Sequence, residues 1–224
     1  MKNILCLIDA LTLGGAERQL IGLASMLQKK GYHVDLAYYY KDNFYEKLAS
    51  EEELNTFLID VSNNRISKIW NIYKFVKRAH YDTVIAYKDG PNIIACVLKL
   101  FGLNFKLVVS ERVASQTVTL KDQIKYLIYR WADYVVPNSF SQRTFICKNF
   151  PILANKTVTI TNFTDINHFT PSLVKRTDDG IRILTVARIA QQKNILNYLQ
   201  AAKMILDEFP HSIFGWYGDR KSVV

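Results

Sequence analysis

The chain has 224 residues, 49% of them hydrophobic, which is enough to bury a core and suits one domain plus part of another. No uncharged apolar run reaches 18 residues and residues 1–9 are too short for a secretory signal, so we expect neither export nor a membrane span and place the protein in the cytoplasm. The formal net charge of +9 favours an anionic partner, but no RNA-binding signature, zinc-finger spacing or long basic tail occurs, so we expect no nucleic acid.

Short β-rich runs alternate with longer helical patterns over the first 160 residues. Strands are predicted at 3–9, 33–40, 55–60, 82–87, 106–110, 133–137 and 156–160. Helices are predicted between them at 16–30, 43–50, 67–79, 91–100, 121–131 and 140–150. Such alternation is typical of a parallel sheet with helices on both faces. We therefore predict an α/β, Rossmann-like first domain over residues 1–161.

Residues 162–180 interrupt this alternation with polar residues, a proline and a glycine, and we predict that they form a linker. The pattern then restarts with a strand at 181–189, a helix at 194–209 capped by Asn194, and a strand at 211–219. One strand, helix and strand unit has too little apolar surface to cover a parallel pair on both faces. We therefore expect residues 181–224 to be the truncated start of a second Rossmann-like domain.

Gly14 and Gly15 lie between the first predicted strand and the first predicted helix. In an open α/β sheet, ligands bind beyond the carboxyl ends of the strands, where helix N-termini offer unpaired N–H groups to anions. Two residues without side chains can adopt positive φ and admit a ligand to the backbone. They would serve equally well in a tight strand-to-helix turn. Their spacing lacks the dinucleotide G-x-G-x-x-G pattern, which disfavours an NAD-dependent enzyme.

Five segments follow one another in order: "GGAER", "VVSERVAS", "DYVVPNSFSQ", "ITNFTDINHFTP" and "ILTVARIAQQKN". Together they resemble glycosyltransferase family 4, whose members have the GT-B fold of two Rossmann-like domains. The resemblance implies an acceptor-side domain followed by the beginning of a nucleotide-sugar domain. It also implies a retaining hexosyl or N-acetylhexosaminyl transfer from a UDP- or GDP-sugar, without a cofactor or required metal. The implied acceptor is lipid-linked or a saccharide, in the biosynthesis of a surface polysaccharide.

The resemblance matches Arg188 and Lys193 to the arginine and lysine that hold the donor diphosphate in this family. Arg188 follows a predicted strand and Lys193 precedes a predicted helix, so two cations and the positive end of the helix dipole would suit a pyrophosphate. The alternative is that both are solvated surface charges. Ala187 and Asn194 replace the family's usual glycines before the arginine and after the lysine, which leaves the geometry of this loop open.

Two further loops at predicted strand ends supply candidates for contacts with the acceptor or the donor. These candidates are Glu17, Arg18, Ser110, Glu111 and Arg112. The alternative for Glu111 and Arg112, and likewise for Glu17 and Arg18, is a local pairing of their charges. Many relatives carry a histidine after the fourth strand, but this chain reads "IAYKDGPN" there. We therefore assign no catalytic residue, and Lys88 receives no role.

Two segments, 63–80 and 121–134, mix basic and aromatic residues. Basic faces with aromatic residues can lie on anionic bilayers, where a lipid-diphosphate acceptor would be found. The alternative, which we favour, is that each helix buries its aromatic residues against the sheet and exposes its lysines. A peripheral contact with the inner face of the cell membrane is the competing expectation.

Family members carry a later segment with paired glutamates that contact the donor sugar and ribose, and nothing after Gly218 corresponds to it. We therefore expect a C-terminally truncated family member that keeps the diphosphate contacts and loses much of the wall around the sugar. The sequence leaves its activity open. The alternative function is a noncatalytic module, or a vestigial fragment, that binds a sugar phosphate or a lipid.

Overall fold

The computed structural model describes residues 2–61, 64–113, 117–164, 166, 169–170 and 181–218. The chain divides into two compact units, Met1–Thr164 and Asp165–Val224. Most of the predicted linker, including all of 171–180, lies outside the described residues, as does the end of the chain from residue 219. Within the described part, every helix is too short or too polar to cross a membrane.

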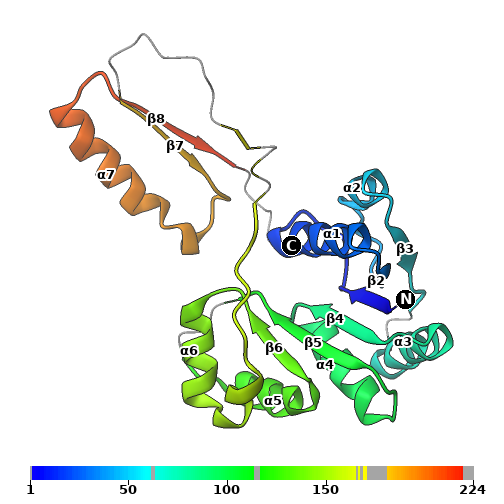
Figure 1. Ribbon diagram of the computed structural model, residues 1–224. Helices are drawn as coiled ribbons and strands as arrows, with labels where there is room; N and C mark the ends of the chain where they lie inside the picture. Colours follow the sequence, from blue (N-terminus) through cyan, green and yellow to red (C-terminus); the bar gives the residue numbers. More distant parts are fainter. Residues whose placement is uncertain are drawn as a thin grey trace. The chain divides into compact units, whose positions relative to one another are not determined.

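The first unit is built on six parallel strands in the order β3-β2-β1-β4-β5-β6 (Figure 1). The strands are β1 (Asn3–Leu7), β2 (His33–Tyr38), β3 (Asn55–Leu58), β4 (Thr83–Tyr87), β5 (Lys106–Glu111) and β6 (Tyr134–Pro137). The chain moves outward in one direction from β1 and in the other from β4, so the topological switch point lies between these two strands. The Rossmann-like architecture expected from the sequence is confirmed.

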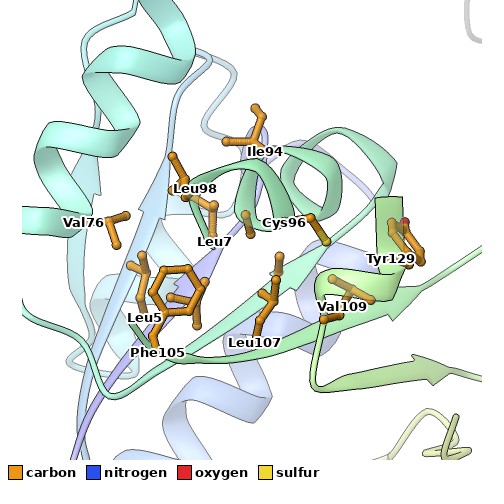
Figure 2. Packing of buried hydrophobic residues seen from close by; sticks show 14 of the residues in the cluster. Leu5, Leu7, Val76, Ile94, Cys96, Leu98, Phe105, Leu107, Val109 and Tyr129 are labelled. Carbon is orange, nitrogen blue, oxygen red and sulfur yellow. The ribbon is translucent and has the colours of Figure 1, made fainter. Parts of the chain in front are cut away.

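Helices cover both faces of this sheet. They are α1 (Gly15–Lys29), α2 (Glu46–Glu51), α3 (Arg65–Ala79), α4 (Asp89–Leu100), α5 (Leu120–Ile128) and α6 (Phe140–Asn149), with short 3₁₀ turns η1 (Tyr129–Trp131) and η2 (Pro151–Lys156). Strand β1 is buried on both faces, because Leu5 and Leu7 join the core under α3, α4 and α5 (Figure 2), whereas Ile4 and Cys6 join the core under α1 and α2. Burial on both faces explains why this strand is an unbroken apolar run.

The strand predicted at 156–160 is wrong. The segment makes a single bridge to β6, between Thr157 and Val135, and two further backbone hydrogen bonds from Val158 and Ile160. Its first residues are held elsewhere: Lys156 Nζ donates to the carbonyls of residues 130 and 132, and Thr157 Oγ1 donates to the Leu153 carbonyl at 2.7 Å. These side-chain bonds tie the start of the segment to η1 and η2, so a regular strand does not form.

Beyond this segment the chain returns to α1. The Gln19 amide and the Phe163 backbone exchange two hydrogen bonds, of 2.9 and 3.0 Å. The Phe163 ring occupies space that only a glycine leaves free, since a Cβ on Gly22 would lie 2.3 Å from Cζ of that ring. The exit of the chain from the first unit is therefore fixed to α1 by a specific contact.

Helix α5 exposes apolar residues and buries a lysine, which is the reverse of the arrangement we favoured. Leu120, Ile124 and Leu127 share one face and are 78%, 61% and 59% exposed. Lys125 and Tyr126 point into the core and are buried. The expectation that this helix buries its aromatic residues is confirmed for Tyr126, and the expectation that it exposes its lysines is wrong for Lys125.

Helix α3 follows the favoured pattern only in part. Ile72 and Val76 are buried against the sheet, but Trp70 is 54% exposed and stacks on Tyr73 with a ring separation of 5.4 Å. The ammonium groups of Lys74 and Lys77 lie over these two rings. Trp70 and Tyr73 thus make cation–π contacts with lysines of the same helix, and Tyr73 also packs against the core.

The described residues of the second unit form one parallel strand pair, β7 (Arg182–Val186) and β8 (Ile213–Tyr217), joined by the 3₁₀ turn η3 (Gln191–Lys193) and helix α7 (Ile195–Glu208). Tyr198 of α7 packs edge-on against Phe214 and Trp216. Leu184 and Val186 of β7 stay 64% and 76% exposed. Within the described residues, α7 therefore covers this strand pair incompletely.

We expect Leu98→Ala to lower the free energy of unfolding by about 2–5 kcal/mol, because Leu98 is fully buried on α4 and its removal leaves a cavity. Leu100→Ala is the matched control, since Leu100 lies on the same helix and is 52% exposed. That control should cost less than about 1 kcal/mol. Urea unfolding of both variants measures the difference, and equal losses would contradict the core described above.

Candidate functional site

A charged cluster joins the carboxyl ends of β1 and β4 to the start of α1. Lys88, directly after β4, places its Nζ 2.8 Å from Asp9 Oδ1 and 2.6 Å from Glu17 Oε1. The Thr12 hydroxyl also donates to Glu17 Oε1. Because β1 and β4 flank the switch point, this cluster lies where doubly wound sheets bind their ligands.

The contacts of Lys88 keep both Glu17 and the lysine charged. Burial alone would raise the pKa of Glu17, but hydrogen bonds from Lys88 and Thr12 outweigh burial and hold that pKa below its ordinary value. Burial likewise would lower the pKa of Lys88, yet its bonds to Asp9 and Glu17 raise it above the ordinary value. Glu17 and Lys88 therefore form a charged pair at the switch point at neutral pH.

The backbone of Lys88 is strained. Its φ and ψ are 75° and 160°, a region that essentially only glycine occupies and that costs on the order of 1–3 kcal/mol for other residues. The ion pairs of Lys88 with Asp9 and Glu17 offset this cost. They form only when the side chain points toward the start of α1, and the strained backbone directs it there. Strained residues of this kind cluster at functional sites, which makes Lys88 a candidate that the sequence did not reveal.

Of the two glycines, Gly14 alone is required by its surroundings, and for a reason other than the one expected. Gly14 is extended, with φ −155° and ψ 161°, and Gly15 begins α1, so the expected positive φ is wrong for both residues. A Cβ on Gly14 would lie 2.4 Å from Glu17 Oε2, whereas a Cβ on Gly15 would meet nothing within 4 Å. Gly14 thus makes room for the buried Glu17 carboxylate under the loop.

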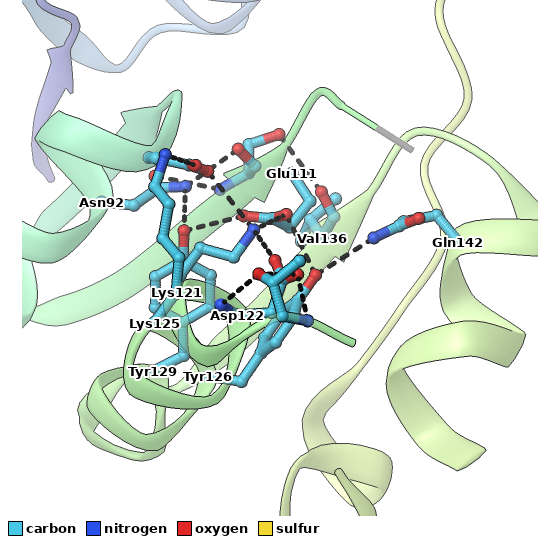
Figure 3. Close-up of polar contacts among 12 residues, drawn as sticks. Asn92, Glu111, Lys121, Asp122, Lys125, Tyr126, Tyr129, Val136 and Gln142 are labelled. Carbon is cyan, nitrogen blue, oxygen red and sulfur yellow. Dashed lines mark hydrogen bonds and ion pairs between the residues drawn. The ribbon is translucent and has the colours of Figure 1, made fainter. Parts of the chain in front are cut away.

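Glu111, at the end of β5, is held inside the unit rather than at its surface (Figure 3). It is 1% exposed, and its carboxylate accepts hydrogen bonds from Tyr129 at 2.7 Å, Lys125 at 2.9 Å and Tyr126 at 3.2 Å. Among the described residues, Lys125 and not Arg112 is the cation that pairs with Glu111. The local pairing of Glu111 with Arg112 that the sequence left open is therefore not found there.

Ser110 is buried beside Glu111. Its backbone exchanges two hydrogen bonds with the Asn92 amide, and its hydroxyl donates to the Val136 carbonyl at 3.2 Å. The structure thus brings Ser110 and Glu111 together in an interior network that also includes Asn92 and Lys125. Sequence reasoning missed Lys125, because a lysine between Ile124 and Tyr126 gives no sign that it points inward.

Arg112 remains accessible at the end of β5. Its guanidinium lies 4.0 Å from the centroid of the Tyr87 ring, and Nη1 donates to Asn162 Oδ1 at 2.9 Å. Its buried Nε–H has no hydrogen-bond partner in the part of the chain that is described. Arg18, by contrast, lies on the exposed side of α1. Among the described residues, Arg112 is therefore a candidate whose Nε–H could donate a hydrogen bond to a ligand.

Arg188 and Lys193 lie in the second unit and are both exposed. Arg188 comes two residues after β7, and Lys193 ends η3 directly before α7. Asn194 has the left-handed φ of 53° and ψ of 47°, the conformation that a glycine adopts readily and that asparagine tolerates. Asn194 therefore replaces the family's usual glycine without a change of backbone conformation being needed, but its side chain does not cap α7 as predicted.

The model of Glycosyltransferase Family 4 matches residues 13–168. A curated Campylobacter jejuni protein, GalNAc-alpha-(1->4)-GalNAc-alpha-(1->3)-diNAcBac-PP-undecaprenol alpha-1,4-N-acetyl-D-galactosaminyltransferase, is 27% identical over 215 residues. That match covers 90% of this chain and 56% of the relative, so the chain spans little more than half of the relative's length. A second N-acetylgalactosaminyltransferase of the same organism is 26% identical over 132 residues.

Solved structures show the same fold. Anabaena HepE in complex with UDP-glucose superposes with a TM-score of 0.72 at 17% identity, covering 98% of this chain and 70% of that one. A glycosyltransferase from Rickettsia africae superposes with a TM-score of 0.70 at 13% identity, covering 99% and 69%. The expected relation to the GT-B fold is confirmed by these likenesses.

We expect Gly14→Ala to lower the free energy of unfolding by about 2 kcal/mol or more, because the new methyl group displaces the buried Glu17 carboxylate from Lys88. Gly15→Ala is the matched control and should be neutral or slightly stabilising, since its Cβ meets no atom and alanine favours a helix. Thermal unfolding of both variants compares them. Equal stabilities of the two variants would show that the Glu17 carboxylate does not need position 14 to lack a side chain.

Proposed function

The chain belongs to glycosyltransferase family 4, and from this premise we propose that it transfers a sugar, with retention, from a UDP- or GDP-sugar to a lipid-linked saccharide in surface polysaccharide biosynthesis. The observation that carries the proposal is the charged cluster at the switch point, built from residues of the β1–α1 and β4–α4 loops. The names of the two Campylobacter relatives, which contain a diphospho- or PP-undecaprenol acceptor, support a lipid-linked acceptor. The HepE complex supports UDP as the nucleotide.

The donor diphosphate is proposed to bind Arg188 and Lys193. Both cations lie close in the chain to the N-terminus of α7, where the partial positive charge of the helix adds to theirs. Negative charge on the diphosphate grows as the bond to the sugar breaks, so the same cations would stabilise the transition state more than the ground state. In this proposal they do so without a required metal.

On the acceptor side, the proposed contacts are Arg112, Arg18 and the loop of Gly14 and Gly15. Arg112 Nε–H finds no hydrogen-bond partner among the described residues, and the guanidinium lies over Tyr87, the residue before the strained Lys88. Ser110 and Glu111 are proposed to support the structure of this loop without touching a substrate, because their side chains are buried and hydrogen-bonded within the unit.

Arg188→Ala and Lys193→Ala should each weaken UDP binding by about tenfold or more, because each removes a charge-assisted hydrogen bond to a phosphate. Lys203→Ala is the matched control, since Lys203 is an exposed lysine of α7. Titration calorimetry with UDP, with and without EDTA, measures the effect. Unchanged affinity in both variants would contradict the assignment, and UDP binding without sugar transfer would favour a noncatalytic module.

We also propose that the exposed face of α5 rests on an anionic bilayer, next to the lipid-linked acceptor. Leu120, Ile124 and Leu127 give this helix an apolar stripe. Lys121 is 80% exposed at the side-chain level, and Arg130 lies over the partly exposed Trp131 ring. An apolar stripe flanked by cations and a tryptophan is the composition that binds an anionic membrane interface.

Leu127→Ser should reduce binding to vesicles of phosphatidylglycerol and phosphatidylcholine roughly fivefold, because about 1 kcal/mol of apolar transfer is lost. Leu196→Ser is the control, since Leu196 is 71% exposed on α7 and lies outside the stripe. Co-sedimentation with anionic and neutral vesicles gives the bound fractions. Equal binding of wild type and Leu127→Ser, or no preference for anionic vesicles, would rule out this contact.

A further inference from the structure

The two carboxylates at the switch point differ in how far ligands can reach them, while the Lys88 side chain between them is 28% exposed. Glu17 is 2% exposed, and its carboxylate is enclosed by Lys88, Thr12 and the Gly14 loop. The Asp9 side chain is 31% exposed. Its Oδ1 accepts hydrogen bonds from Lys88 Nζ at 2.8 Å and from the Ala10 N–H at 2.9 Å. No hydrogen bond from the described residues reaches Asp9 Oδ2.

Glu17 is thus the buried carboxylate that holds Lys88 in place, and Lys88 in turn contacts Asp9. Asp9 is the carboxylate that a ligand can reach. Glu17 and Asp9 hold the ammonium of Lys88 between them, so the position of Asp9 Oδ1 is fixed relative to α1 and β4. The strained backbone of Lys88 is consistent with this role, because the strain persists only where the surroundings require the side chain to point one way.

The charge of the cluster selects the chemistry of its ligand. Two carboxylates and one ammonium leave a net charge of −1, which opposes a phosphate or diphosphate at this place. An ionised carboxylate with a free oxygen is a strong acceptor for hydroxyl donors. A neutral saccharide offers many hydroxyl groups and no negative charge, so it is the ligand class that fits.

We propose that Asp9 Oδ2 accepts a hydrogen bond from a hydroxyl of the saccharide acceptor and that Lys88 positions Asp9 for this contact. The inference rests on the proposed function, since it assigns the acceptor to the first unit. Asp9 is then a specificity-determining residue that requires a hydroxyl at one position of the sugar. Lys88 is a positioning residue that need not touch the saccharide.

Saturation-transfer difference NMR on the full chain tests this with four neutral probes: N-acetylgalactosamine, N-acetylglucosamine, galactose and glucose. Wild type should bind at least one of them, and Asp9→Asn should weaken that binding by about tenfold, because the amide is a weaker acceptor than the carboxylate. Asp42→Asn is the matched control, since Asp42 is exposed in the loop before α2, and it should bind as wild type does.

Two further measurements separate positioning from folding. Lys88→Met should weaken sugar binding and Lys88→Arg should restore most of it, which a loss of stability alone would not produce. In wild type, the ¹³Cγ resonance of Asp9 should move when the bound sugar is added. This wild-type shift gives a result even where Asp9→Asn does not fold.

Two outcomes would overturn the inference: no binding of any probe to wild type, or equal binding by wild type and Asp9→Asn with an unmoved Asp9 resonance. UDP titration of the same wild-type sample keeps the proposed function separate. A chain that binds sugar through Asp9 without binding UDP would refute the donor assignment and retain this inference. A chain that binds UDP without sugar would do the reverse.

Discussion

The ammonium of Lys88 lies between the carboxylates of Asp9 and Glu17, and the arrangement of the switch point depends on that contact. Burial of Glu17 would be costly without a cation beside it, since an unpaired charge inside a protein loses its hydration. The lysine reaches this position only through a strained backbone, and the Glu17 carboxylate fits only because Gly14 has no side chain. The contact between Lys88 and Glu17 therefore accounts for a glycine and a buried acid at the start of α1 and for a strained residue after β4.

A second cation, Lys125, has a similar role one strand farther along the sheet. It neutralises the buried Glu111 at the end of β5, while Tyr126 and Tyr129 donate the remaining hydrogen bonds to that carboxylate (Figure 3). Because Lys125 and Tyr126 face the core, Ile124 and Leu127 lie on the opposite face of α5 and are exposed. The buried ion pair thus fixes the orientation of the helix, and that orientation creates the apolar stripe proposed to meet the membrane.

Much of the fold could be predicted from local sequence, because strands buried on both faces are apolar runs and helices that pack on a sheet repeat at 3.6 residues. The segment around Thr157 shows where this reasoning ends. Its β-branched residues suit a strand, but bonds from Lys156 and Thr157 to the preceding turns hold it in another path. Less of the site could be predicted. Arg188 and Lys193 were assigned from their places in a family motif, whereas no local sequence pattern marks Asp9, Lys88 or Lys125.

The sequence by itself determined the order of strands and helices, the family, and the residues that lie at strand ends, because these depend on neighbours along the chain. Only the tertiary structure decided which of those residues are accessible. No sequence pattern separates Glu17 and Glu111 from Asp9, yet the first two are buried beside lysines, whereas Asp9 keeps one oxygen without a hydrogen bond from the described residues. The physical reason is that burial and ion pairing depend on contacts between residues far apart in the chain, such as Asp9 with Lys88, which local composition does not encode.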